Sequence, residues 1–192
     1  MTRWQPGATE RLQAAALDLF ATQGFDQTTT AEIAGSVGLT ERTFFRHFSD
    51  KREVLFFGQD QLVRIFLEGV EAAPTEASPL EVVAAGVQSA AGFFADERRS
   101  HSRMRQTVIE QNPALQEREQ HKLRTLGEVV GRALRVRGVT EPAATLAAES
   151  GITIFGVAFA QWIDEGEERS FATIAAAVFR ELVTLTTSVS SP

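Results

Sequence analysis

The sequence predicts an all-α fold of about nine helices. In every segment long enough to judge, apolar residues recur with the period of an amphipathic helix. β-branched residues never alternate with polar residues for long, so no strand is predicted. A length of 192 residues, 43% of them hydrophobic, suits one domain or a small domain joined to a larger one.

Local signals mark the first three helices. An apolar stripe ends before Gly24, a residue type that often ends a helix. Thr29, followed three residues later by Glu32, has the pattern of a capping box and opens a second helix. Gly38 ends this helix, and Thr40 caps a third. The stripe of the first helix consists of Leu12, Ala16, Leu19 and Phe20.

The remaining six helices are placed by similar start signals, such as a capping side chain followed by proline or glutamate. They are expected to begin at Asp50, Ser78, Ser100, Asn112, Thr140 and Ser170. They are expected to end near residues 71, 95, 111, 137, 166 and 188.

Composition excludes several kinds of chemistry. The chain has no cysteine, which rules out disulfides, thiolate zinc sites, iron–sulfur clusters and cysteine nucleophiles. Its 3 histidines lack the spacing of a metal site, so neither a metal nor a cofactor is expected. The sequence has no spaced carboxylate pair and no glycine-rich phosphate loop, so an enzyme is not expected either.

The apolar segments predict a cytoplasmic protein with no membrane partner. The longest strongly apolar stretch, Gly151 to Ile163, is too short to cross a bilayer. The first residues of the chain lack the apolar core of a signal peptide.

The net charge of −6 is not spread evenly along the chain. The segment up to Arg52 contains six basic and six acidic residues and is therefore neutral. Four of its basic residues lie between Arg42 and Arg52. Because phosphate binding depends on the local field, this segment is a candidate for DNA binding despite the acidic total.

The second and third helices have the arrangement of a helix-turn-helix. They are short and meet at Gly38, where a residue without a Cβ permits a tight crossing. Glu41, Arg42 and Thr43 lie in the first turn of the third helix, whose early residues enter the major groove in such motifs. Arg42 could bind guanine through two hydrogen bonds, and Glu41 could accept one from cytosine N4.

The stretch from Gly24 to Leu55 resembles the DNA-binding domain of TetR/AcrR-type bacterial transcriptional regulators. The similarity rests on the glycine–aromatic pair after the first helix and on the threonine-capped second helix with its Ile-Ala pair. The Gly-Leu-Thr turn and the aromatic third helix match as well. The resemblance implies a helix-turn-helix DNA-binding domain over residues 1–52 and a helical effector-binding and dimerisation domain over residues 53–192.

The resemblance also assigns roles to individual residues. Positions held here by Glu41 and Arg42 usually contact bases in the family. Residues at positions that usually contact phosphates are Thr29, Thr30, Thr43, His47 and Lys51. Phe45 occupies a position that is very often tyrosine, and this chain has no tyrosine, so a phosphate hydrogen bond is lost there. Phe45 can still pack against a sugar or a thymine methyl, and Arg46 could supply a compensating contact.

Each of these assignments has a structural alternative. Outside this motif, the basic residues of the third helix would be interpreted as a solvated face. Phe44 and Phe48 are predicted core residues. For Phe45 a core position and a position in the DNA groove are equally supported. A second basic run is expected to be a solvated helix end, with a site for an acidic ligand group as the alternative. This run consists of Arg98, Arg99, Arg103 and Arg105.

The last two helices predict a homodimer. The helix expected from Thr140 is apolar nearly all round, and the helix expected from Ser170 is similar. A helix buried on all sides needs more cover than one small subunit provides. In the TetR/AcrR family the corresponding helices pair with their copies as a four-helix bundle. The small residues expected to permit this close approach are Ala147, Gly151, Ala158 and Ala160.

The larger domain is expected to enclose a pocket for a small hydrophobic effector, as the resemblance implies. The candidate lining residues are large and apolar: Phe66, Phe93, Phe94, Met104, Ile109, Phe155, Phe159 and Trp162. Ordinary core packing is the alternative for each of them. An aromatic, mostly neutral lining would favour a fatty acyl or aromatic molecule.

Together these expectations describe a ligand-responsive repressor that binds a pseudo-palindromic DNA operator as a homodimer and is released by a small hydrophobic effector. The alternative is a helical ligand- or partner-binding protein that has lost sequence-specific DNA binding. The acidic total charge and the absence of tyrosine motivate this alternative. A third hypothesis, an all-helical enzyme with an incidental helix-turn-helix, finds no catalytic residues in the sequence.

Overall fold

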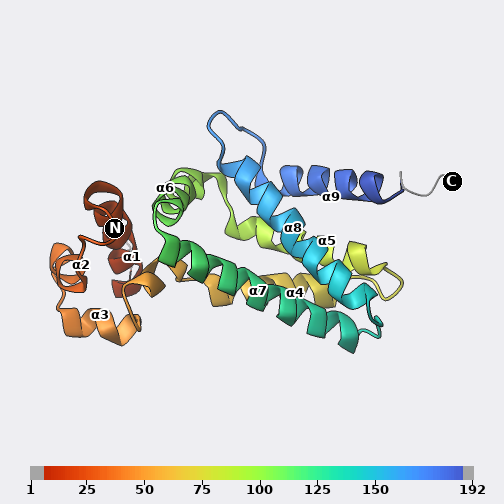
Figure 1. The fold of residues 1–192 in the computed structure, drawn as a ribbon, viewed down its shortest axis with the longest axis horizontal. Helices are drawn as coiled ribbons and strands as arrows, with labels where there is room; N and C mark the ends of the chain where they lie inside the picture. Colours follow the sequence, from red (N-terminus) through yellow and green to blue (C-terminus); the bar gives the residue numbers. More distant parts are fainter. Residues whose placement is uncertain (1–6, 188–192) are drawn as a thin grey trace, which may run out of the picture. The chain divides into compact units, whose positions relative to one another are not determined.

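The computed structural model describes residues 7–187, which form nine α-helices and three short 3-10 helices, with no strand among them (Figure 1). The predicted all-α fold is confirmed. Contacts divide the chain into two compact units. The first unit takes in the residues up to Gln59 together with His101–Glu119, and the second takes in Asp60–Ser100 together with the residues from Gln120 on. The first unit thus extends past residue 52 and includes a stretch from the middle of the chain.

The predicted starts of the second and third helices are observed. The Thr29 hydroxyl accepts a hydrogen bond from the Glu32 N–H, and the Glu32 carboxylate accepts one from the Thr29 N–H, which completes the capping box. The Thr40 hydroxyl accepts a hydrogen bond from the Thr43 N–H at 3.2 Å and caps the next helix. The two capped helices are α2 (Thr30–Ser36) and α3 (Glu41–His47), and α1 (Ala8–Gln23) precedes them.

The core of the first unit is apolar and partly aromatic. Phe44 and Phe48, both predicted as core residues, are 0% and 4% exposed, whereas Phe45 is 52% exposed. Phe45 was assigned equally to the core and to the DNA groove, and its exposure shows that it is not a core residue. Two helices from the middle of the chain, α6 (Arg99–Glu110) and α7 (Pro113–Val136), complete this core. They contribute Val108, Ile109 and Leu115.

The long helix predicted from Asp50 to about residue 71 is interrupted. Asp50 Oδ1 accepts hydrogen bonds from two N–H groups further along, at 2.7 and 3.1 Å, so the start signal is real. It opens the 3-10 helix η1 (Arg52–Phe56) instead. Gly58 then adopts a φ of +89°, a left-handed conformation that an α-helix does not include, and α4 (Gln59–Ala72) begins after it. The prediction of one continuous helix was wrong.

The second unit is built around α5, α8 and α9, which pack on one another (Figure 1). α5 follows the predicted capping box at Ser78, but it ends at Ser89 and not near residue 95, because a 3-10 helix takes over. The elements are α5 (Pro79–Ser89), η2 (Ala90–Phe93), η3 (Asp96–Arg98), α8 (Ala143–Ile163) and α9 (Phe171–Thr187). The end predicted for the last helix, residue 188, lies outside the described residues.

Most of the small residues of α8 point inward, which corrects the expectation that they face a partner subunit. Ala147, Gly151 and Ala158 are buried within the subunit, and a Cβ on Gly151 would lie 3.0 Å from a valine of α5. These residues permit close packing inside one chain. Of the predicted set only Ala160 is exposed, and Gly156, whose Cβ would meet nothing within 4 Å, is exposed as well.

By length and composition α8 could cross a membrane, since the helix has 21 residues and is longer than the apolar stretch identified in the sequence. Eight of its residues are buried in the second unit. A core helix of a soluble protein satisfies the same criteria, so the helix is weak evidence for a membrane span.

Arg99, at the start of α6, forms hydrogen bonds with the loop between α8 and α9. Its guanidinium donates hydrogen bonds to the backbone carbonyls of Glu167 and Arg169, and to Asp96 Oδ1 at 2.6 Å. It also lies 5.3 Å from the centre of the Trp162 ring. The Arg99 side chain is only 12% exposed, so the predicted solvated helix end was wrong for this residue.

The same loop contains a carboxylate with a lowered pKa. Hydrogen bonds from the Arg169 guanidinium and backbone N–H lower the pKa of Glu167 from 4.5 to about 2. Because this pKa is depressed in the folded state, the stabilisation is present above pH 4.5 and is lost as the pH falls towards 2. We expect Glu167→Gln to lower the melting temperature near neutral pH and to flatten its decline between pH 4.5 and 2.

Thermal melts followed by circular dichroism measure this effect. Glu128→Gln is the matched control, because Glu128 is exposed and makes no ion pair within residues 7–187. Equal acid sensitivity in the unaltered protein and in both variants would contradict the assignment.

Candidate nucleic-acid interface

The turn between α2 and α3 is fixed by a glycine and by backbone hydrogen bonds. Gly38 has a φ of +70°, a conformation that other residue types adopt only with strain. The Leu39 N–H donates to the Ala34 carbonyl at 2.9 Å, which closes the end of α2. Arg11 of α1, which the sequence analysis did not single out, donates to the Val37 carbonyl at the same turn. These bonds fix the direction in which α3 leaves α2.

α3 presents a basic and aromatic face to solvent. Arg42, Phe45 and Arg46 are all exposed, and Phe45 lies three residues after Arg42 on the same side of the helix. Within residues 7–187 neither arginine makes a hydrogen bond or an ion pair through its side chain. Two cations without an acidic partner are available for an anionic ligand, and DNA offers both phosphates and base edges.

Four other predicted contact residues have partners inside the first unit. The Thr30 hydroxyl donates to Glu41 Oε1 at 2.5 Å, which joins the first turns of α2 and α3. Thr43 Oγ1 lies 3.0 Å from the hydroxyl of the residue that caps α3. His47 Nδ1 lies 3.0 Å from the hydroxyl of Thr9 in α1. A ligand that engages these same atoms must compete with the internal bonds.

Lys51 is partly buried and holds the loop that precedes α2. Its Nζ donates to the carbonyls of Phe25 and Thr28 at 2.7 and 2.8 Å, and it lies 4.3 Å from the centre of the Phe25 ring. Since an ammonium group has three N–H donors, one donor remains for a phosphate. Thr29, which is exposed, follows this loop directly. Lys51 therefore positions the start of α2.

Two arginines that the sequence analysis did not assign to this site hold η1 in place. Arg105 donates to the Leu55 carbonyl at 2.7 Å and to Glu119 at 3.0 Å. Arg118 forms an ion pair with Glu53 at 2.7 Å. The expectation of a solvated helix end was thus wrong for Arg105 as well. No sequence signal indicated these bonds to η1, because the partners lie 50 and 65 residues apart along the chain.

The eight residues predicted to bind an effector are divided between the two units. Six belong to the second unit: Phe66, Phe93, Phe94, Phe155, Phe159 and Trp162. Phe94 lies at the centre of an aromatic cluster, with its ring 5.5 to 5.6 Å from the rings of the last three. Ile109 belongs to the core of the first unit, and Met104 is exposed in that unit.

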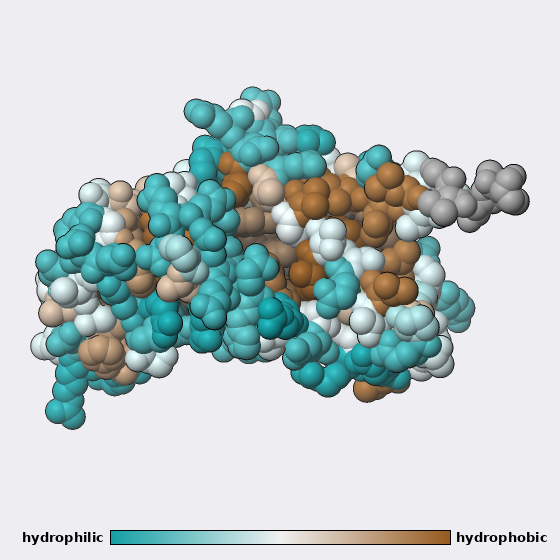
Figure 2. Space-filling model, viewed as in Figure 1, coloured by the Kyte–Doolittle hydropathy of each residue, from teal (hydrophilic) through white to brown (hydrophobic). Residues whose placement is uncertain are grey.

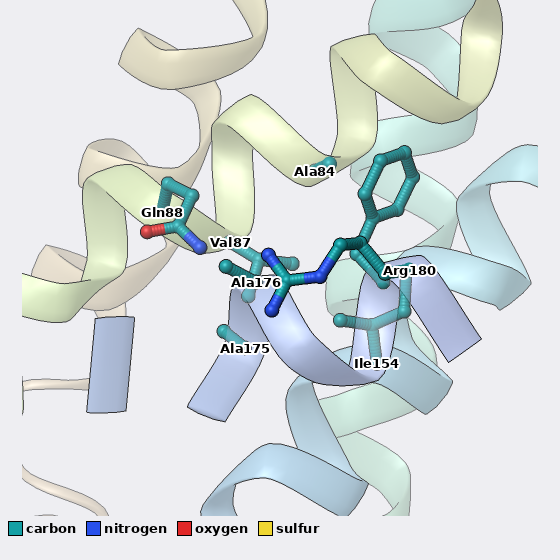
Figure 3. A pocket seen from close by; sticks show the side chains of 8 residues that line it. Ala84, Val87, Gln88, Ile154, Ala175, Ala176 and Arg180 are labelled. Atoms are coloured by element: carbon teal, nitrogen blue, oxygen red, sulfur yellow. The ribbon is translucent and has the colours of Figure 1, made fainter. Parts of the chain in front are cut away.

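A hollow of about 240 Å³ opens between α5, α8 and α9 (Figure 3). Its wall is mostly apolar, and none of the predicted effector-binding residues lines it. The guanidinium of Arg180 extends across the hollow (Figure 3). The lining residues are Ala84, Val87, Gln88, Ile154, Ala175, Ala176, Phe179 and Arg180. The hollow is therefore distinct from the aromatic cluster around Phe94.

An apolar face of α8 and α9 is left uncovered. Figure 2 shows hydrophobic surface gathered over these helices. Leu146, Val157 and Leu185 are among the large hydrophobic residues exposed there. Exposed apolar patches on soluble proteins commonly mark a site of interaction with another molecule.

This geometry defines a DNA-binding protein of the helix-turn-helix class, and comparison with known families specifies it further. Residues 12–56 match the family described as bacterial regulatory proteins of the tetR family. Residues 77–186, more than half of the chain, match the MftR C-terminal domain. The chain belongs to the TetR family of transcriptional regulators, with a C-terminal domain of the MftR type. This family consists of DNA-binding regulators and not of enzymes.

Individual relatives agree with this assignment. The HTH-type transcriptional regulator TcmR of Streptomyces glaucescens is 34% identical over 87 residues, which cover 45% of this chain and 38% of TcmR. The match thus spans well under half the length of that relative.

Two solved structures share the fold at low sequence identity. A Clostridium perfringens fatty acid metabolism regulator is 18% identical with a TM-score of 0.59, over 91% of this chain and 97% of that chain. The TetR family repressor FadR of Thermus thermophilus, solved in complex with lauroyl-CoA, is 22% identical with a TM-score of 0.54, over 91% and 93% of the two chains.

Proposed function

We propose that the chain is a ligand-responsive, one-component repressor that binds a pseudo-palindromic DNA operator as a homodimer and is released by a small hydrophobic effector. The observation that carries this proposal is the pair of unpartnered arginines on the exposed face of α3. Arg42 lies in the first turn of that helix, where side chains reach base edges, and a guanidinium can bind guanine through two parallel hydrogen bonds. A protein that acts on bacterial chromosomal DNA works in the cytoplasm.

The remaining side chains of the motif have complementary roles in this proposal. Glu41 accompanies Arg42 at the bases, and Arg46 replaces the phosphate contact that a tyrosine would make at the position of Phe45. Further phosphate contacts come from Thr29, Thr30, Thr43, His47 and the free donor of Lys51.

The dimer is proposed to form through the uncovered face of α8 and α9. Gly156 and Ala160 are exposed on α8 and have the i, i+4 spacing that places them on one side of the helix. Small side chains at this spacing permit two helices to approach closely. Pairing with a second copy would also cover Leu146 and Val157, which are exposed in the single chain.

The effector is proposed to be apolar because the second unit offers aromatic side chains for it. Phe94, Phe155, Phe159 and Trp162 pack ring to ring. The lauroyl-CoA bound by Thermus thermophilus FadR is an acyl ligand in a protein of the same fold, which supports an apolar ligand here. An effector that binds better to a conformation unable to hold DNA would be coupled to the operator by about 1–3 kcal/mol.

Selection of bound sequences from a random duplex pool tests the proposal. We expect a two-fold-related consensus with half-sites about one helical turn apart, and an affinity that falls steeply with salt concentration. Failure to enrich any sequence at low salt would overturn the proposal and favour a protein that has lost sequence-specific DNA binding.

Arg42→Ala should change the base preference as well as the affinity. The variant is expected to bind the selected consensus more weakly by about 1–3 kcal/mol, because a bidentate contact to one base is lost. Binding to random DNA should change little. Fluorescence anisotropy on both duplexes measures the difference, and equal losses on the two would remove Arg42 from base recognition.

A further inference from the structure

Phe45 is an exposed aromatic side chain beside Arg42 on the solvent face of α3. It follows Arg42 by three residues, so the two side chains are neighbours on one side of the helix, with Arg46 on the other side of Arg42. The ring is 52% exposed in the free protein. A ligand that engages Arg42 therefore lies close to this ring as well.

The core of the first unit holds the Phe45 ring in a defined position. The Phe45 and Phe44 rings form an edge contact, with the centres 5.5 Å apart and the planes at 86°. Phe44 is itself fully buried and packs on Phe48 at 5.3 Å. A side chain that is already ordered by its neighbours loses little conformational entropy when it binds.

The chemistry of the ring restricts what it can recognise on DNA. A phenyl group has no polar atom, so it cannot form a hydrogen bond with a phosphate or with the polar edge of a base. The 5-methyl group of thymine is the apolar group that base pairs display in the major groove, and phenylalanine is among the side chains that contact it. Because Phe45 lies on the same face as Arg42, it points into the groove together with that residue.

We propose that Phe45 is a specificity-determining residue that recognises the 5-methyl group of a thymine in each half-site of the operator. This inference rests on the proposed DNA-binding function. The thymine lies beside the base pair that Arg42 contacts, because the two side chains are separated by one turn of α3. Phenylalanine at this position therefore loses the phosphate contact of a tyrosine hydroxyl and gains recognition of a base. A phosphate contact carries no such sequence information.

Replacement of single thymines by deoxyuridine in the selected duplex tests the inference, since only the methyl group is removed. At one position per half-site we expect the affinity of the unaltered protein to fall about fourfold, which corresponds to one buried methyl group. Phe45→Ala should bind the thymine duplex more weakly and should lose no further affinity with deoxyuridine at that position. Its thermal melt should match that of the unaltered protein, because the removed ring is half exposed.

Phe57→Ala is the matched control, since Phe57 is also an exposed phenylalanine of the first unit but lies outside α3. This variant should keep the full sensitivity to deoxyuridine. A half-site without thymine, or an equal deoxyuridine effect with and without the Phe45 ring, would overturn the inference while the proposed function stands. If the selection yields no consensus at all, the proposed function fails and the inference fails with it.

Discussion

Replacing Gly156 by arginine is expected to separate the proposed dimer into folded monomers. Gly156 is exposed on α8, and a Cβ at this position would meet no atom of its own subunit within 4 Å. The substitution therefore leaves the fold of one chain intact. In a symmetric pair of helices it would place two charged side chains in the contact, where neither has an acidic partner.

The loss of the dimer should weaken operator binding by a factor of about 10²–10⁴, because two linked half-site contacts become independent. Sedimentation velocity measures the oligomeric state, and fluorescence anisotropy on the selected duplex measures the affinity. A Gly156→Arg variant that remains dimeric with unchanged affinity would show that the subunits meet elsewhere.

The same helix provides a control for this experiment. Gly151 is buried, and a Cβ there would lie 3.0 Å from Val83 Cβ of α5. Gly151→Arg should therefore destabilise the second unit and abolish its cooperative melt, whereas Gly156→Arg should melt normally. Gly156→Ala should remain dimeric, since a single methyl group fits where two small residues approach each other. Comparison of the two arginine variants thus distinguishes the effect of packing inside the subunit from the effect of packing between subunits.

Local signals were sufficient to predict most of the helix starts. The side chains of Thr29, Thr40 and Ser78 all accept the hydrogen bonds expected of capping residues. The break at Gly58 was not predicted, because the capping signal at Asp50 opens a 3-10 helix as readily as an α-helix. A capping side chain bonds only to the next few N–H groups, so it carries no information on where a helix ends.

The orientation of α8 could not be predicted from the sequence. Its residues are apolar nearly all round, so no hydrophobic period shows which face meets α5. Gly151 and Gly156 look equivalent in the sequence, and only the fold shows that one is buried and the other exposed. The face that an apolar helix buries is set by the elements packed against it, and one of these, α5, is distant from α8 in the chain.

The candidate site also has features that the sequence predicts and features that only the fold shows. The motif was enough to predict that Arg42 and Arg46 belong to the DNA-binding segment, and the structure leaves both exposed. The bonds from Thr30 to Glu41 and from Thr9 to His47 join separate helices, so they were not visible in the sequence. Ile109 was assigned to the effector pocket by its position in the chain, but α6 enters the core of the first unit.

Trp162→Ala is expected to be the most damaging substitution in the second unit. The indole ring is 0% exposed, lies 5.6 Å from the Phe94 ring, and donates a hydrogen bond from Nε1 to Asp96 Oδ1 at 3.3 Å. Removal of a fully buried tryptophan costs about 3–5 kcal/mol, since the packing is lost and a cavity remains. Urea unfolding followed by circular dichroism measures the loss of free energy of unfolding.

Trp162→Phe separates the two contributions of this side chain. It keeps an aromatic ring near Phe94 and loses the hydrogen bond to Asp96, so its cost should be well below that of the alanine variant. If the two variants are equally unstable, the hydrogen bond and not the ring accounts for the effect. A loss below about 1 kcal/mol for alanine would mean that the cluster closes over the vacated space.

The cavity left by Trp162→Ala also tests whether the aromatic cluster can admit an apolar ligand. Apolar cavities of this kind stay dry and bind small aromatic molecules. Indole should therefore raise the melting temperature of the alanine variant in proportion to the logarithm of the indole concentration, and should leave that of the unaltered protein unchanged.

Because the rings of Phe94, Phe155 and Trp162 fill this region in the free protein, a natural effector can enter it only by displacing one of them. Rescue by indole would show that the surrounding rings retain their positions around the vacated site, and the absence of rescue would direct the search for the effector to the hollow beside Arg180.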